Sequence, residues 1–251
     1  MTPERASPPF QIGVATGKAL TIAHDVQIRG PQGEHALADR RAAAMLAMVA
    51  VDGNAWAHRL ADMLWPQTPE ALALQALRAL CADLARLTGM RVIDGTELLQ
   101  LCAGFAVQVG ASAHELDALA DDRMAPSLLG AYTYDDLDEV RDWLSTAQRR
   151  ADRVARMRYA DLSFESERSG DLNAAIAHAQ RALALDRRCE DCLLRLMQLL
   201  TRAGQPAVAL TIYARSDALM RRRHGTPLSN DVRSLADDIA RTGATAGTRK
   251  H

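Results

Sequence analysis

The 251-residue sequence has few aromatic side chains, few cysteines and almost no lysine, and each shortage restricts what the chain can be. Aromatic residues make up 4% of the chain and hydrophobic residues 48%, so the apolar side chains are mainly alanine and leucine. That composition favours packed helices over sheets. Four cysteines in a chain of this length do not make the disulfide framework of a small secreted domain.

Long apolar runs and an excess of charge of one sign are also absent. The longest apolar run, 42–51, is too short to span a bilayer, and the first twenty residues contain no signal-peptide core. We therefore expect a cytoplasmic protein without membrane contact. The formal net charge is −1 and only Lys18 and Lys250 are lysines, so no general basic field draws the chain to nucleic acid.

The N-terminal part combines short strand-like runs with three helical segments. Residues 19–23 and 26–30 are compatible with strands and are separated by His24-Asp25, which indicates a hairpin. Helices are predicted at 36–50, at 55–65 with Asn54 as N-cap, and from Thr68-Pro69-Glu70 to Gly89. Trp56 and Trp65 flank the second helix, and we expect both in the core.

The segment after Gly89 returns to a strand pattern. Residues 90–109, MRVIDGTELLQLCAGFAVQV, predict a strand, a turn at Asp94-Gly95 and further strand-like runs. Strands, three helices and then a β-hairpin is the order of a winged helix.

The C-terminal part predicts helices and contains an internal repeat. Residues 135–170 contain no proline and fit one long helix or a bent pair. Residues 168–188 align with 202–222 at an offset of 34, with identities at eight of twenty-one positions, among them Gly170/Gly204 and Ala175/Ala209. Thirty-four residues is the period of the tetratricopeptide helix hairpin. Residues 171–222 should therefore form three helices, with breaks near 186–189 and 203–206.

Together these segments resemble bacterial regulators of the antibiotic-regulatory-protein class, from about residue 20 to 241. The most specific similarities are Leu64-Trp65-Pro66 after the second helix, Asp142-Trp143-Leu144, and the run 225–229, GTPLS. The resemblance implies a mainly α fold with a small β component, in which an OmpR-like winged helix precedes a tetratricopeptide-like activator domain. The expected division is an N-terminal tail at 1–19, a winged-helix DNA-binding-like domain at 20–110, a bacterial transcriptional activator domain at 111–241 and a flexible C-terminal tail at 242–251.

The implied function is regulation of transcription by binding double-stranded promoter DNA and contacting RNA polymerase holoenzyme. The third helix would read the major groove, with Gln75, Arg78, Arg86 and Arg91 facing DNA and Arg40 or Arg41 contacting the backbone. One departure is that Leu80, Ala82 and Asp83 stand where the family has basic residues. Leu77, Cys81, Leu84 and Ala73 supply a stripe that docks this helix on the core.

The charge balance of the N-terminal part leaves a second function open. Residues 1–110 contain nine basic and ten acidic side chains, whereas phosphate contacts supply most non-specific DNA affinity. Such a domain should bind weakly as a monomer and better as a homodimer on paired half-sites. The alternative is a protein-interaction adaptor whose winged helix no longer binds DNA and whose repeat groove holds a partner.

Cys189 and Cys192 form a CxxC pattern without a second CxxC or a histidine pair to complete a zinc site. The helical setting favours a structural role for the pair, with a redox or metal role as the alternative. No histidine, serine or carboxylate pattern nominates a reaction. We therefore expect neither an enzyme nor a cofactor.

Overall fold

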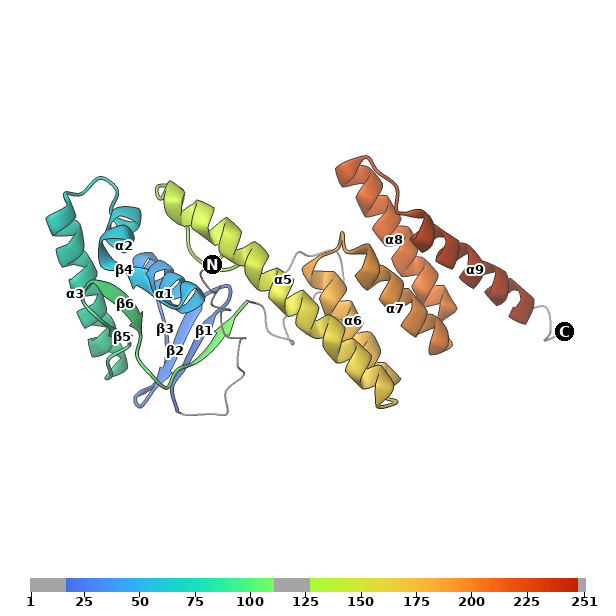
Figure 1. The fold of residues 1–251 in the computed structure, drawn as a ribbon, viewed down its shortest axis with the longest axis horizontal. Helices are drawn as coiled ribbons and strands as arrows, with labels where there is room; N and C mark the ends of the chain where they lie inside the picture. Colours follow the sequence, from blue (N-terminus) through green and yellow to red (C-terminus); the bar gives the residue numbers. More distant parts are fainter. Residues whose placement is uncertain (1–16, 111–126, 248–251) are drawn as a thin grey trace, which may run out of the picture. The chain divides into compact units, whose positions relative to one another are not determined.

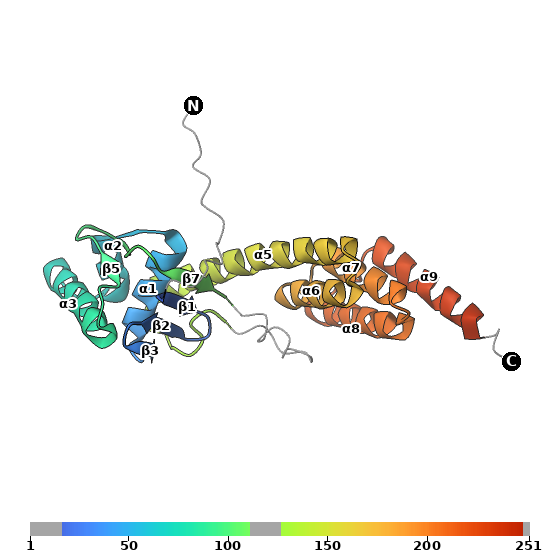
Figure 2. The same ribbon diagram turned by 90° about the horizontal axis from the view of Figure 1, so that it is seen from below.

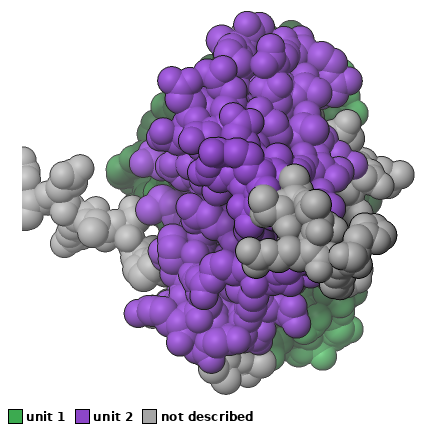
Figure 3. Space-filling view, turned by 90° about the vertical axis from the view of Figure 1, so that its right-hand side faces the viewer, with its two compact units in different colours: residues 1–112, 126–151 green, residues 113–125, 152–251 purple. Residues whose placement is uncertain are grey.

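The computed structural model describes residues 17–110 and 127–247 (Figure 1). They belong to two compact units, coloured separately in Figure 3. Unit 1 contains the described residues up to 110 together with 127–151, and unit 2 contains those from 152 onward. None of the described helices is both long and apolar enough to cross a membrane.

Unit 1 contains a four-stranded sheet. Its order is β3 (Gly33–Ala36), β2 (Val26–Gly30), β1 (Ala19–Ile22) and β7 (Ala106–Val109). The expected hairpin is confirmed, because β1 and β2 pair antiparallel. β7 pairs with β1 in parallel, so the strand after the wing returns to the start of the chain.

The three expected helices of unit 1 are present, with shifted starts. They are α1 (Arg40–Asp52), α2 (Ala57–Leu64) and α3 (Glu70–Thr88). The first was predicted from residue 36, but the Asp39 carboxylate accepts from the backbone N–H groups at the start of α1 and caps the helix there. The preceding residues form β3 instead.

Two expectations about the start of α2 are wrong. Asn54 is not its N-cap, because residues 55–56 form strand β4 (Ala55–Trp56) and Trp56 takes the capping position without a side-chain bond. Trp56 is also not a core residue, since β4 pairs with β6 (Leu98–Leu101) and 52% of the tryptophan remains exposed. Trp65 is half-buried against the core.

The wing follows α3 as the sequence predicts. β5 (Ile93–Asp94) and β6 pair antiparallel around a turn that contains Gly95. Gly95 has φ +95°, and a Cβ there would lie 2.0 Å from the carbonyl oxygen of Leu98. Only glycine fits this turn without displacing the backbone.

Residues 127–151 pack against the rest of unit 1 through two tyrosines. The Tyr132 hydroxyl donates to the carbonyl of Leu37 at 2.6 Å and accepts from the N–H of Val26. The Tyr134 hydroxyl donates to the carbonyl of Arg40 at 2.7 Å. The division between the units therefore differs from the domain boundary expected at residue 110.

The long helix predicted in 135–170 is a single helix, α5 (Asp138–Arg168), whose residues are shared between the two units. The repeat prediction is confirmed by the three helices α6 (Leu172–Leu185), α7 (Glu190–Arg202) and α8 (Pro206–His224). They pack side by side in chain order, followed by α9 (Asn230–Gly247) (Figure 2). α9 continues helical to residue 247, inside the segment expected to be a tail.

The core of unit 2 lies between these helices. Ala175 and Ala209, the matched alanines of the repeat, are both fully buried, and Leu196 and Met197 of α7 pack into the same cluster. Small side chains at equivalent positions let neighbouring helices approach closely. The described chain is thus mainly helical with a small β component in unit 1, as the sequence predicts.

Candidate nucleic-acid interface

α3 has a buried face and an exposed face. Its buried residues are Ala73, Leu77, Leu80, Leu84 and Thr88. Leu80, one of the apolar residues that stand where the family has basic ones, belongs to the buried face, with only 9% of its surface exposed. The residues that the helix turns to solvent are Glu70, Ala71, Leu72, Gln75, Arg78, Ala79, Ala82, Asp83, Arg86 and Leu87.

Gln75 and Arg78 lie one turn apart on this exposed face. Arg78 makes no hydrogen bond or ion pair with any described residue, so its guanidinium has its donors available. It borders a cleft of about 140 Å³ between α3 and the wing, whose other lining residues include Cys81 of α3 and Gly95 and Thr96 of the wing turn. A free bidentate donor beside a wing suits a base edge or a phosphate.

Arg86 and Arg91 have intramolecular partners. Arg86 pairs with Asp83 at 2.7 Å, one turn back on α3. Arg91 pairs with Asp94 at 2.8 Å and donates its Nε–H to the carbonyl of Ile93. Both pairs are well exposed and therefore cost little to break.

The charges on α3 cancel. Its charged side chains are Glu70, Arg78, Asp83 and Arg86, all of them exposed. The turn of the wing contributes two acidic side chains, Asp94 and Glu97, and no basic side chain. A ligand with the charge density of DNA therefore meets a surface without net positive charge here, and affinity must come from geometry or from more than one protomer.

Exposed apolar side chains lie on the same helix. Leu72 is 55% exposed and Leu87 is 46% exposed, near opposite ends of α3. The sequence analysis placed neither residue on the exposed face. Each is a single exposed apolar side chain, and neither forms a contiguous apolar patch with the other.

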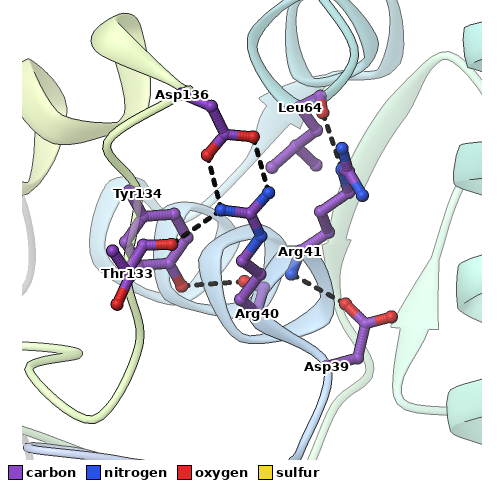
Figure 4. Close-up of polar contacts among 7 residues, drawn as sticks. All are labelled: Asp39, Arg40, Arg41, Leu64, Thr133, Tyr134 and Asp136. Atoms are coloured by element: carbon purple, nitrogen blue, oxygen red, sulfur yellow. Dashed lines mark hydrogen bonds and ion pairs between the residues drawn. The ribbon is translucent and has the colours of Figure 1, made fainter.

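Arg40 and Arg41 lie at the start of α1 and are engaged within unit 1 (Figure 4). The Arg40 guanidinium binds both carboxylate oxygens of Asp136, at 2.5 and 2.6 Å, and donates to the carbonyl of Thr133 at 2.7 Å. This hydrogen bonding raises the pKa of Arg40 and lowers the pKa of the Asp136 carboxyl. A DNA contact by Arg40 would have to replace these bonds.

Arg41 donates its Nε–H to the carbonyl of Leu64 at 2.9 Å, and its guanidinium lies 5.5 Å from the centre of the Trp65 ring. The sequence analysis did not find the partners of either arginine. Asp136 is 96 residues away from Arg40, and local patterns contain no signal for a pairing at that separation.

Within 17–110 and 127–247 no group of three or more histidine, cysteine, aspartate or glutamate side chains is placed to hold a metal ion. The fold and the exposed face of α3 are the features that suggest a function.

No family model and no curated protein matches the chain. Among solved structures it is similar to Mycobacterium tuberculosis EmbR in complex with a low affinity phosphopeptide. The TM-score is 0.55, the sequence identity is 14%, and the match covers 90% of this chain. The fold is shared.

The matched region is 65% of the EmbR chain, less than two thirds of its length. At this identity the likeness to EmbR concerns the fold and not the residues that contact a ligand.

Proposed function

We propose that the protein is a cytoplasmic bacterial regulator of transcription that binds double-stranded promoter DNA through α3 and contacts RNA polymerase holoenzyme or partner proteins through its helical repeats. One observation carries the proposal. In a winged helix, α3 docks by one face and turns Gln75 and Arg78, which pairs with no described residue, to solvent beside the wing. The similarity in fold to EmbR supports the antibiotic-regulatory-protein class and a regulator's role.

Specificity and affinity would come from different sources. A bidentate arginine or glutamine contact to a base is worth roughly 1–3 kcal/mol of discrimination, so Gln75 and Arg78 suffice for a short half-site. The neutral charge of α3 gives little phosphate affinity. Occupancy of a promoter would then depend on a homodimer on paired half-sites or on contacts with the polymerase.

The test is selection of duplexes from a random pool with the full chain, followed by titration of the selected sequence at low salt. Arg78→Ala should relax specificity at one base pair, with discrimination falling by roughly 1–3 kcal/mol. Arg141→Ala is the matched control, because it removes one exposed arginine from unit 1 outside α3. The proposal fails if the wild-type protein selects no sequence, or if both variants change binding equally.

A second candidate is a protein-interaction adaptor. The exposed Leu72 and Leu87, together with the intramolecular pairing of Arg86, favour a protein surface over a nucleic acid on α3. Leu72→Ser combined with Leu87→Ser distinguishes the two functions. The adaptor predicts that this variant loses its partner, whereas DNA binding through Gln75 and Arg78 should persist.

A further inference from the structure

The two cysteines of the CxxC pattern lie in the first turn of α7. Cys189 is the N-cap of the helix, and its sulfur accepts from the N–H of Cys192 at 3.3 Å. Side chains three residues apart on a helix have Cβ atoms roughly 5–6 Å apart, so a small adjustment of the cap brings them to disulfide geometry.

An arginine from another helix faces this pair. Arg156 of α5 donates its Nη1–H to the sulfur of Cys189 at 3.1 Å and lies 3.9 Å from the carboxylate of Asp186. The Cys189 sulfur therefore receives two N–H donors at the N-terminus of a helix. Donors, a neighbouring guanidinium and a helix N-terminus all stabilise negative charge on sulfur.

The two cysteines differ in their access to solvent. Cys189 is half-buried, whereas only 7% of Cys192 is exposed. Burial, with a smaller effect of the hydrogen bond to Cys189, raises the pKa of the Cys192 thiol to about 12. The geometry makes Cys189 the sulfur that an oxidant reaches first and Cys192 the thiol held beside it.

The other cysteines provide internal controls. Cys81 is half-buried in unit 1, with its sulfur 3.8 Å from that of Met45, and burial raises the pKa of its thiol. Cys102 follows β6 and donates its backbone N–H to the carbonyl of Val92. Neither belongs to a CxxC pair in the sequence.

We propose that Cys189 and Cys192 are a peroxide-oxidisable dithiol that forms a reversible intramolecular disulfide. The Cys189 thiolate attacks one peroxide oxygen and the O–O bond breaks, which gives a sulfenic acid and, from hydrogen peroxide, hydroxide that leaves as water after protonation. Cys192 then loses its proton and attacks the Cys189 sulfur. The S–O bond breaks, and the departing hydroxide takes up a proton to leave as a second water. The cysteines are oxidised by two electrons and the peroxide is reduced by two.

The disulfide would change how α7 is held on α5. A disulfide sulfur carries no charge, so the hydrogen bond from Arg156 to Cys189 is weakened or lost. Other contacts with α5 remain. Arg195 of α7 lies 2.5 Å from a carboxylate oxygen of Glu167 and donates to the carbonyl of Ser163 at 3.2 Å, and Arg202 at the end of α7 also pairs with Glu167. Oxidation would thus release the N-terminal end of α7 and leave its middle and its C-terminal end attached.

The test is treatment of the reduced full chain with hydrogen peroxide, followed by thiol counting and peptide mapping. The four free thiols should fall to two, and the mass should drop by two hydrogens in the single tryptic peptide that contains both Cys189 and Cys192. Dithiothreitol should restore all four. A disulfide that involves Cys81 or Cys102, or oxidation of those two before Cys189, would overturn the proposal.

Variants separate the roles of the two sulfurs. Cys192→Ser should accumulate a sulfenic acid at Cys189 that dimedone traps, and Cys189→Ser should abolish trapping. Arg156→Gln should slow the reaction several-fold, whereas Cys81→Ser with Cys102→Ser should leave its rate unchanged. One equivalent of tightly held zinc in the native protein, lost in both single-cysteine variants, would identify a metal site instead. Mapping of the wild-type protein decides the question even where a variant folds poorly, and it does not depend on DNA binding.

Discussion

Replacing Asp83 by asparagine should strengthen DNA binding. Asp83 lies on the exposed face of α3 and pairs with Arg86, with side-chain exposures of 61% and 76%. An ion pair this exposed stabilises the fold by less than about 1 kcal/mol, so Asp83→Asn should leave the free energy of unfolding nearly unchanged. The substitution removes one negative charge from a helix whose charges cancel and releases Arg86 for a phosphate.

The expected gain follows from one additional phosphate contact. The slope of log K against log salt concentration should become steeper by about 0.9. At low salt we expect the binding free energy to become more favourable by roughly 1 kcal/mol, which corresponds to about a fivefold lower Kd. Raising salt from about 50 to 200 mM should then weaken the variant about 3.5-fold more than the wild-type protein.

The assay is fluorescence anisotropy of a labelled duplex across a salt series. Asp138→Asn is the matched control, because Asp138 forms an equally exposed pair with Arg141 at 2.6 Å, also in unit 1 but on α5. Equal effects of the two substitutions would show that only net charge matters. An unchanged salt slope for Asp83→Asn would refute the assignment of α3 as the DNA-binding helix.

Three further predictions concern the stability of unit 1. Leu80→Ala should lower the free energy of unfolding by roughly 2–5 kcal/mol in urea titrations, whereas Leu87→Ala on the exposed face should change it by less than about 0.5. Gly95→Ala should lower the melting temperature more than Gly104→Ala, because both have positive φ but only at Gly95 would the Cβ meet a backbone oxygen. Burial raises the pKa of the Tyr134 hydroxyl in the folded protein, so the unfolded chain loses this proton at a lower pH than the folded one. The free energy of unfolding should therefore fall as the pH rises above about 10. Tyr134→Phe should reduce this fall, which urea titrations at pH 9 and 11 would measure.

Local signals predicted the helical repeat well. The offset of 34 located the breaks between α6, α7 and α8, because the glycine at 204 and the buried alanines are requirements of each hairpin by itself. Spacing alone placed Ala73, Leu77 and Leu84 in the docking stripe of α3, but it also placed there Cys81, which is only half-buried, and it omitted the buried Leu80. Helical periodicity puts Leu80 beside Leu77 and Leu84.

Features that depend on pairing with another segment were missed. β3 has the sequence GEHA, without the branched side chains that indicate a strand, and it forms because β2 offers it an edge. Trp56 lies on the surface because residues after α3 pair with β4. Arg40 is engaged by Asp136, in a segment that the sequence assigns to the following domain. Each of these features depends on contacts with another segment of the chain. The pattern of residues within the segment itself does not contain that information.

The parallel pairing of β1 with β7 has a consequence for the order in which the chain can fold during translation. Ala19 pairs with Ala106, so β1 leaves the ribosome well before the strand β7 that pairs with it. Until then β1 is an unsatisfied edge that carries Leu20 and Ile22, both fully buried in the finished protein. Such an edge can pair with a strand of another chain. A chain released before residue 106 should therefore aggregate.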